Sequence, residues 1–250
     1  MTFPDVIIGG GLAGLTAARL IHQLGIDFRL LEARAVLGGR VLSVDSFGQP
    51  SADGFDLGAS WYWPAMQPGI HGLVQELRLP TFTQESEGDV IFQRMSREAP
   101  RRYKAQSALY ESQRLVGGTG ALIAALAVSI PAKSVQLGAR VTRAVLQDRR
   151  VVLEYTTEAG ATQTIEAFQA IFALPPRLLE ATVSFSPTVE PAITQRWRET
   201  PTWMAPHAKF FAFYERPFWK EAGLSGTAQS MAGPLVEIHD ATTYSGQAAL

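Results

Sequence analysis

The 250-residue sequence contains no cysteine. Disulfide bonds and thiolate metal sites are therefore excluded for this chain. Only 18% of the residues are charged and the formal net charge is −1, so the composition indicates neither a nucleic-acid partner nor an electrostatic membrane-surface partner. We interpret the arginine pairs at positions 101–102 and 149–150 as solvated loop charges.

Long apolar stretches are also missing. The longest one, residues 121–130, stops at Pro131 and is too short to span a bilayer. No basic segment precedes the first apolar run, so we expect no signal peptide, a cytoplasmic location and no membrane partner. The four histidines are far apart and lack ligand spacing, so no metal site is predicted.

The first 32 residues match a dinucleotide-binding unit. The apolar residues 5–8 predict a buried strand, and residues 9–14 (GGGLAG) follow it with the pattern G-x-G-x-x-G. Helical spacing of apolar residues then predicts a helix that ends at Gly25, and residues 28–31 predict a second strand. Glu32 closes this strand, eighteen positions after the last glycine of the pattern.

Each of these residue types has a physical role in such a unit. Gly9 permits the tight turn after the strand, Gly11 leaves room for a pyrophosphate, and Gly14 lets the helix pack closely on the strand. Free N–H groups and the positive dipole at the helix start favour phosphate. Glu32 can accept hydrogen bonds from ribose hydroxyls and would repel a 2′-phosphate, which disfavours NADP.

A second glycine segment follows at once, since residues 32–40 read EARAVLGGR. A Glu-Ala-Arg segment that leads into Gly-Gly-Arg resembles the flavin-containing amine oxidase superfamily, which includes monoamine and polyamine oxidases. The resemblance implies that both segments lie along FAD, and it disfavours an NAD-dependent enzyme. Because the chain has no cysteine, the cysteinyl–flavin link of some family members is excluded.

Two later segments extend the resemblance. Residues 55–61 (FDLGASW) resemble the family's Asp-x-Gly-Ala stretch, whose backbone passes close to the flavin. Gly58 and Ala59 are small enough for such an approach, although a β-turn beside a core aromatic cluster is the alternative interpretation. In the family, the residue that matches Val141 recognises adenine through its backbone.

The segment at residues 208–219 resembles the family pattern Lys-x-x-x-x-Tyr-x-x-Pro-Phe-Trp. Its alternation predicts a strand with Lys209, Phe211 and Phe213 on one face. The family's lysine is linked through a water to flavin N5, which implies a catalytic role for Lys209 with a pKa lowered by desolvation. The residues alone leave an alternative, a lysine whose ammonium reaches solvent from the strand start.

The predicted site therefore has one catalytic residue, Lys209, and no metal ligand. The predicted FAD-binding residues are Gly9, Gly11, Leu12, Ala13, Gly14, Glu32, Ala33, Arg34, Gly38, Gly39, Arg40, Gly58, Ala59, Ser60 and Val141.

The predicted fold class is α/β, α+β overall: a Rossmann-like FAD-binding domain with a parallel sheet and a β-meander, plus an interleaved substrate domain with a β-sheet. We expect the meander at residues 135–137, 140–145 and 151–155, and a buried parallel strand at 170–174. Residues 104–115 leave room for one short helix.

The predicted domains are discontinuous. Residues 1–79 and 116–178 form the FAD-binding domain, and residues 80–115 and 179–250 form a partial substrate-binding domain.

The resemblance implies an FAD-dependent oxidoreductase that transfers hydride from an amine to flavin N5, with reoxidation by dioxygen to hydrogen peroxide. The partner is then a small-molecule amine. Two alternatives stay open: a desaturase or protoporphyrinogen-oxidase-like flavoprotein, and a flavin-binding or partner-binding module without turnover. In the family, the chain normally continues beyond the part that residues 246–250 resemble. We therefore also expect a missing C-terminal part or a homo-oligomer.

Overall fold

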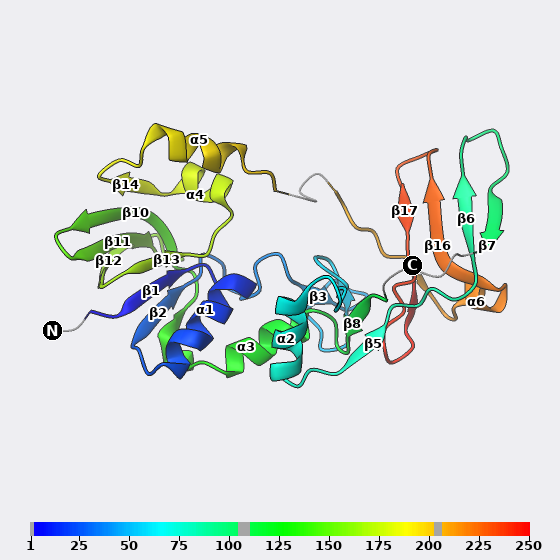
Figure 1. Ribbon diagram of the computed structural model, residues 1–250, viewed down its shortest axis with the longest axis horizontal. Coiled ribbons are helices and arrows are strands. Elements are labelled where there is room, and N and C mark those ends of the chain that lie inside the picture. The colour runs from blue at the N-terminus through cyan, green and yellow to red at the C-terminus, as the bar shows by residue number, and fades with distance from the viewer. Residues whose placement is uncertain (1–2, 105–110, 203–206) are drawn as a thin grey trace. The chain divides into compact units, whose positions relative to one another are not determined.

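The computed structural model describes residues 3–104, 111–202 and 207–250 (Figure 1). It divides into two compact units, each built from two stretches of chain. Unit 1 comprises Met1–Val41 and Ile123–His207, and unit 2 comprises Leu42–Leu122 and Ala208–Leu250. These bounds differ from those of the predicted FAD-binding and substrate-binding domains, which are functional assignments and stay a prediction.

Unit 1 contains a four-stranded parallel sheet with the order β13-β1-β2-β9. The strands are β1 (Asp5–Ile8), β2 (Phe28–Leu31), β9 (Val135–Gln136) and β13 (Ala170–Phe172). Helix α1 (Leu12–Gln23) connects β1 to β2, as the glycine pattern and the apolar spacing predict. Every residue of β1 is buried, as expected for a central parallel strand that is covered on both faces.

A second sheet of unit 1 has the order β12-β11-β10-β14. Its strands are β10 (Arg140–Gln147), β11 (Arg150–Thr156), β12 (Thr162–Ala167) and β14 (Ser184–Ser186). The predicted meander was wrong in one strand, because residues 135–136 pair in parallel with β2 in the first sheet. The third meander strand is instead β12, whose first three residues are polar and exposed and therefore gave no apolar signal.

The two sheets of unit 1 enclose one hydrophobic core. Val6, Ile8 and Leu31 of the parallel sheet pack in one cluster with Val141 and Leu153 of the meander. The cluster also includes residues from the helical end of the unit, formed by α4 (Pro176–Thr182) and α5 (Pro191–Glu199). The meander thus covers one face of the parallel sheet, while α1 lies on another side of it (Figure 1).

Unit 2 contains a four-stranded mixed sheet with the order β17-β16-β6-β7, and three two-stranded pairs. The mixed sheet consists of β6 (Asp89–Gln93), β7 (Arg101–Lys104), β16 (Leu224–Ser230) and β17 (Glu237–Ile238). The pairs are β3 (Ser43–Val44) with β4 (Phe55–Asp56), β5 (Thr81–Thr83) with β8 (Gln113–Leu115), and β15 (Phe213–Tyr214) with β18 (Ala248–Ala249).

The helices of unit 2 are α2 (Pro68–Glu76) and the short α6 (Phe218–Glu221), whereas α3 (Gly120–Val128) begins in unit 2 and ends in unit 1. The parallel sheet with its meander and the separate β-sheet of unit 2 confirm the predicted fold class.

Two local predictions need correction. The strand predicted from residue 208 starts only at Phe213, so Lys209 belongs to no strand. The predicted helix in residues 104–115 lies partly outside the described residues, and its end, residues 113–115, is strand β8 paired with β5. In both places tertiary pairing decides the local structure, because short segments have weak propensities of their own.

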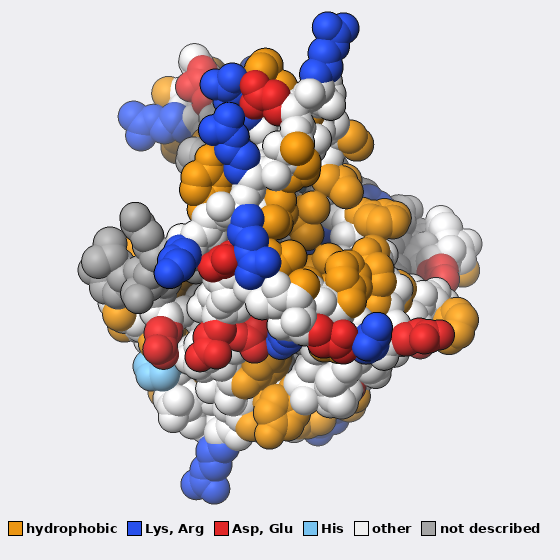
Figure 2. Space-filling model, turned by 90° about the vertical axis from the view of Figure 1, so that its right-hand side faces the viewer, with side chains coloured by type: hydrophobic (Ala, Val, Ile, Leu, Met, Phe, Trp, Pro, Cys, Tyr) orange, Lys and Arg blue, Asp and Glu red, His pale blue; other side chains and the backbone are white. Residues whose placement is uncertain are grey.

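Figure 2 shows side chains of both charges interspersed on the face that it presents, with hydrophobic side chains among them. Among the described residues, no helix has the length and apolar character that crossing a membrane requires. Within residues 3–104, 111–202 and 207–250, no group of three or more His, Asp or Glu side chains could hold a metal ion.

Candidate functional site

In unit 1, the two glycine segments that the sequence singled out lie side by side. Gly11 and Gly38 form an isolated parallel bridge, and the Gly38 N–H donates to the Gly10 carbonyl at 2.9 Å. A Cβ added to Gly39 would lie 3.1 Å from the Gly11 Cα, and one added to Gly14 would lie 1.8 Å from the Gly9 carbonyl oxygen. Side chains at these positions would therefore displace backbone.

The start of α1 is open to an anion. Gly11 is its N-cap, no side chain caps the helix, and its first turn contains no acidic residue. Leu12 and Ala13 therefore present N–H groups of the first turn, together with the positive end of the helix dipole. A phosphate group is the ligand that such a terminus favours.

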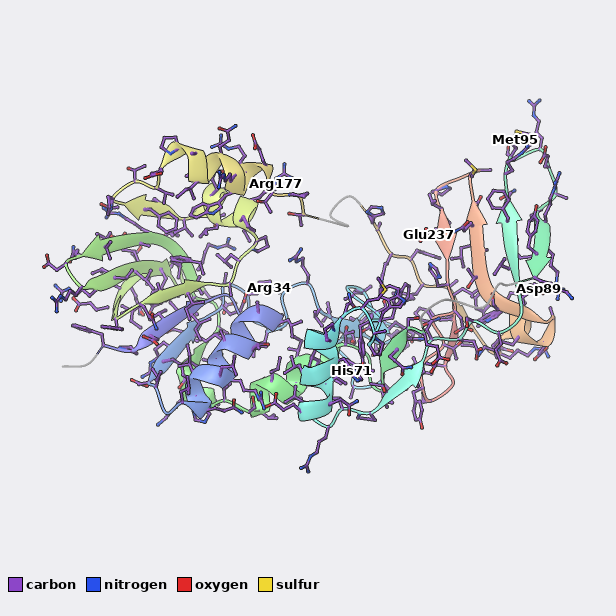
Figure 3. All side chains as sticks on the ribbon, in the orientation of Figure 1. Arg34, His71, Asp89, Met95, Arg177 and Glu237 are labelled. Atoms are coloured by element: carbon purple, nitrogen blue, oxygen red, sulfur yellow. The ribbon has the colours of Figure 1, made fainter. Side chains whose placement is uncertain are left out.

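Glu32 joins the glycine loop to the end of β2. Glu32 is buried, at 6% exposure, and its carboxylate accepts hydrogen bonds from the Gly10 N–H at 2.6 Å and the Arg34 N–H at 2.9 Å. The Arg34 guanidinium in turn donates to the Gly39 carbonyl at 2.7 Å and lies 3.6 Å from Glu32. Arg34 projects from the loop after β2 in Figure 3, while Arg40 is exposed.

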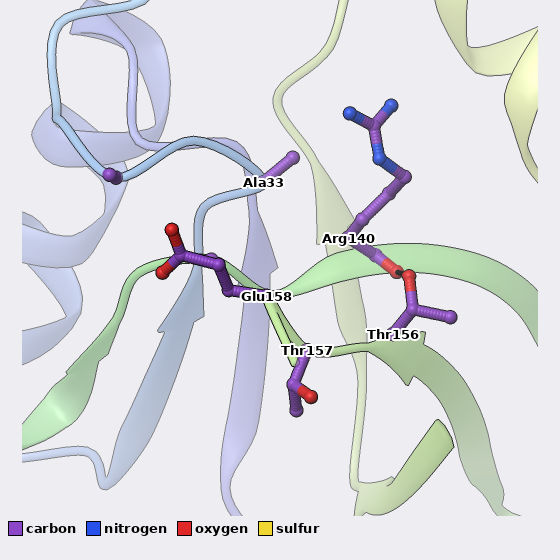
Figure 4. A pocket seen from close by; sticks show the side chains of 7 residues that line it. Ala33, Arg140, Thr156, Thr157 and Glu158 are labelled. Carbon is purple, nitrogen blue, oxygen red and sulfur yellow. Dashed lines mark hydrogen bonds between the residues drawn. The ribbon is translucent and has the colours of Figure 1, made fainter. Parts of the chain in front are cut away.

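A hollow of about 190 Å³ lies next to this loop (Figure 4). Ala33 and Ala35 line it from the loop after Glu32. Gly138 and Arg140 line it just before and at the start of β10, and residues 156–158 line it from the end of β11 and the turn that follows. Val141 follows Arg140 and is buried. The pairing of β14 with β10 covers only residues 143–145, so no described strand pairs with that edge of β10 at Val141.

Together, these features of unit 1 fit the ADP portion of a dinucleotide. The glycines leave space for a pyrophosphate, the α1 terminus favours its charge, and the buried carboxylate at the end of β2 is an acceptor of the kind that a ribose hydroxyl needs. The unpaired backbone edge at Val141 and the adjacent hollow suit a flat heteroaromatic base.

In unit 2, the residues predicted to approach the flavin form one segment, residues 56–60, which begins at the end of β4. At its start, the Asp56 carboxylate is 2% exposed, and its Oδ1 accepts hydrogen bonds from the Ser43 hydroxyl at 2.6 Å and from the Thr119 N–H and hydroxyl, both at 2.8 Å. The 56–60 segment is thus tied to β3 and to the turn before α3.

The Lys209 ammonium is fixed on the 56–60 segment. Its Nζ donates to the Asp56 carbonyl at 2.9 Å, to the Gly58 carbonyl at 2.7 Å and to the Ser60 hydroxyl. The same atom lies 5.9 Å from the centre of the Trp61 ring, within cation–π range. Lys209 as a whole is exposed, which agrees with the alternative interpretation, but its ammonium is held by three acceptors of the 56–60 segment.

Two charged groups act on Lys209 from neighbouring strands. Desolvation lowers the pKa of Lys209 below its ordinary value; the Asp56 carboxylate opposes this shift and the Arg114 guanidinium adds to it. Arg114 is itself buried, and its guanidinium donates to the Thr242 carbonyl at 2.8 Å. The protonation of Lys209 therefore depends on the balance between burial and the Asp56 charge.

The sequence interpretation missed the residues that hold the 56–60 segment, namely Asp56 as a side chain, Ser43 and Thr119. A signal for Asp56 existed, because it directly follows an apolar strand residue and an aspartate in such a place needs partners when buried. Ser43 lies opposite Asp56 in the antiparallel β3–β4 pair, whereas Thr119 is 76 positions from Ser43 and reaches Asp56 only through tertiary structure.

Two family profiles match the chain. An "NAD(P)-binding Rossmann-like domain" matches residues 7–77, and "Flavin containing amine oxidoreductase" matches residues 94–245, which is more than half of the chain. Among curated relatives, Polyamine oxidase 2 of Arabidopsis thaliana is 33% identical over 96 residues, and the flavin-containing amine oxidase A of Sus scrofa is 40% identical over 77 residues.

These alignments span 35% and 31% of this chain, but only 17% and 14% of the relatives' own length. Among solved structures, putrescine oxidase bound to putrescine matches with a TM-score of 0.82 at 18% identity, covering 100% of this chain and 74% of that one. Cyclohexylamine oxidase from Brevibacterium oxydans matches with a TM-score of 0.80 at 16% identity and the same coverage. At such identities the likeness shows the fold.

The family profile over residues 94–245 and the relatives together confirm the predicted recognition and, with it, the predicted cofactor FAD. The chain belongs to the flavin-containing amine oxidoreductase family.

Proposed function

We propose that this protein is an FAD-dependent amine oxidase. The observation that carries the proposal is the Lys209 ammonium held on the 56–60 segment, in a chain whose unit 1 has the features of an ADP-binding site. A lysine with a lowered pKa beside small residues suits the flavin-adjacent lysine that the family resemblance implies.

In this proposal the residues of unit 1 hold the ADP portion of FAD. The α1 start takes the pyrophosphate, Glu32 accepts from the ribose, and the Val141 backbone faces adenine. Ala33, Arg34 and the glycines of both segments line the cofactor, with Arg40 at their end. In unit 2, Gly58, Ala59 and Ser60 face the flavin ring system, and Lys209 assists its reaction with substrate or dioxygen.

When bound at these residues, FAD would supply the redox chemistry: hydride acceptance from the carbon next to the amine nitrogen, which leaves an imine, and reoxidation by dioxygen to hydrogen peroxide. The chain's own residues orient the cofactor and exclude water. Our domain assignment (residues 1–79 and 116–178 for FAD, 80–115 and 179–250 for substrate) and a cytoplasmic location belong to this proposal.

The substrate class in this proposal is a small aliphatic or alicyclic amine. The relatives carry the names of polyamine oxidases and flavin-containing amine oxidases, and the solved structures those of putrescine and cyclohexylamine oxidases. All of these substrates present an amine nitrogen next to a carbon that can lose a hydride.

The test is a visible absorption spectrum of the chain mixed with FAD, titrated with putrescine, spermidine, cyclohexylamine and benzylamine without oxygen. We expect FAD to bind and at least one amine to bleach the visible absorption of the bound flavin. Lys209→Met should keep the flavin bound but slow bleaching or reoxidation; unchanged rates would remove Lys209 from the chemistry.

The same measurement separates the alternatives. If flavin binds but no amine bleaches it, a desaturase-like enzyme or a module without turnover is favoured. Bleaching by a substrate that is oxidised at a C–C bond, such as a porphyrinogen, would identify the desaturase-like enzyme. If this chain alone does not bind FAD, the proposal is wrong for this chain.

A further inference from the structure

The Asp56 carboxylate makes an unusual set of contacts at the start of the 56–60 segment. Oδ1 accepts three hydrogen bonds, from Ser43 and from the backbone and side chain of Thr119. Oδ2 is buried without a partner among the described residues. Burying a carboxylate with one unpaired oxygen reduces the free energy of unfolding, so we expect the position or the charge of Asp56 to have a role.

Thr119 contacts the 56–60 segment at two points. Its hydroxyl lies 2.8 Å from Asp56 Oδ1 and 2.9 Å from the Ala59 carbonyl, and its single proton is shared between these two acceptors. The next N–H along the chain, that of Gly120, donates to the Ser43 hydroxyl at 2.8 Å. The backbone N–H groups of Thr119 and Gly120, at the start of α3, therefore hold the 56–60 segment and its partner Ser43 in place.

Lys209 holds the same segment through other atoms. It bonds to the carbonyls of Asp56 and Gly58, whereas Thr119 bonds to the carbonyl of Ala59 between Gly58 and Ser60. Lys209 and Thr119 therefore hold the segment through different carbonyls. Loss of either donor leaves carbonyls unpaired and the segment free to move.

We propose that Thr119 and Asp56 are positioning residues that fix the 56–60 segment and thereby hold the Lys209 ammonium in its place. The proposal rests on the proposed function in one respect, the closeness of this segment to the flavin. The contacts themselves lie within unit 2 and involve no cofactor.

The charge of Asp56 gives the proposal a second, distinct consequence. The groups that face Lys209 are Asp56 on β4, Arg114 on β8 and the Trp61 ring. The Trp61 ring in turn packs edge-on against His239, with 5.1 Å between the two ring centroids. Asp56 is the anion of this set, and it opposes the lowering of the Lys209 pKa by burial. Removing its charge should therefore increase the neutral fraction of Lys209 at a given pH.

The test is the rate of lysine acetylation by acetic anhydride against pH in the chain without added FAD, measured at Lys209 and Lys220 by mass spectrometry. Only the neutral amine reacts, so the rate reports both access and protonation. Lys220, which pairs with Glu85 at 2.9 Å, is the internal reference. The variants are Thr119→Val, which is isosteric, Thr119→Ser, which restores the hydroxyl, and Asp56→Asn.

We expect Thr119→Val to raise the Lys209 rate about threefold or more across the pH range, since a lost hydrogen bond weakens the fixation by about that factor. Thr119→Ser should return it to the wild-type rate, and Asp56→Asn should shift the midpoint of the pH profile downward. The matched control is Thr83→Val, which should leave the Lys209 rate unchanged, because the Thr83 hydroxyl accepts a hydrogen bond from Gln113 and makes none to the 56–60 segment among the described residues.

A Thr119→Val protein with the wild-type Lys209 profile would overturn the proposal, as would Thr119→Ser that fails to restore it. If Thr119→Val does not fold by circular dichroism, Ser43→Ala provides the same test, since it removes one donor to Asp56 and the acceptor of Gly120. Because no flavin or amine enters the measurement, a failed oxidase assay leaves its result unaffected.

Discussion

Glu32 combines two tasks in one side chain. Its two carboxylate oxygens accept from backbone N–H groups of the glycine loop and of its own loop, so the acid fixes the relation of these loops before any ribose binds. A hydrogen bond to a charged acceptor contributes about 1.5–3 kcal/mol. The residue is therefore both a ligand candidate and part of the fold.

Replacing Glu32 by Gln tests this double role. The amide nitrogen would face one backbone N–H, donor against donor, so we expect the dissociation constant for FAD to rise about tenfold or more, together with a loss of about 1–3 kcal/mol in the free energy of unfolding. Quenching of flavin fluorescence in a titration measures the first. Glu166→Gln, which alters an exposed ion pair of the same unit, should change neither; an equal effect there would reject the assignment.

At the scale of elements, α1 can pack closely on the loop after β1 because Gly14 has no side chain. Gly14 lies in the first turn of α1, where a methyl group would sit 1.8 Å from the Gly9 carbonyl. By contrast, Gly72 in α2 has no atom within 4 Å of its added Cβ. Both glycines lie in helices, but only the first is required by packing.

This difference predicts opposite outcomes for the same substitution. Gly14→Ala should reduce the free energy of unfolding by about 3 kcal/mol, because backbone must move, while Gly72→Ala should increase it by about 0.5–1 kcal/mol through helix propensity. Urea denaturation followed by circular dichroism measures both. A Gly14→Ala chain as stable as the parent would show that α1 does not pack on the glycine loop as described.

At the scale of the whole molecule, both units are assembled from two distant stretches of chain. The features that fit a dinucleotide in unit 1 concern the ADP portion, whereas the 56–60 segment and Lys209 belong to unit 2. In the proposed function, the affinity for FAD therefore comes largely from the half of the cofactor that carries no redox chemistry.

FAD and riboflavin should accordingly differ in their effect on stability. FAD at about one hundred times its dissociation constant should raise the free energy of unfolding by about 2.7 kcal/mol, while riboflavin at the same concentration should have little effect because it lacks the ADP portion. A thermal melt with each ligand measures the difference, and ADP alone should give part of the FAD effect. Equal stabilisation by riboflavin would contradict the ADP-centred site.

Much of unit 1 was predictable because its signals are local. The buried strand, the glycine pattern, the helix and the acid follow one another within 32 residues, and each constrains its neighbour through short-range sterics or helix electrostatics. The apolar run at residues 170–174 likewise predicted a parallel strand, and β13 pairs in parallel with β1. The predicted burial was wrong, because β13 is an edge strand whose residues are half-buried.

Tertiary structure alone decided the rest. β9 joined the parallel sheet and polar β12 completed the meander, because pairing depends on which edges are free and not on apolar pattern. Lys209 was recognisable by its motif, but its three acceptors lie about 150 positions earlier. Thr119 meets Asp56 from well over half a hundred positions away, whereas Ser43 lies opposite Asp56 in the β3–β4 pair. Sequence determined the chemistry of these residues; their contacts are long-range hydrogen bonds that exist only once the chain has folded.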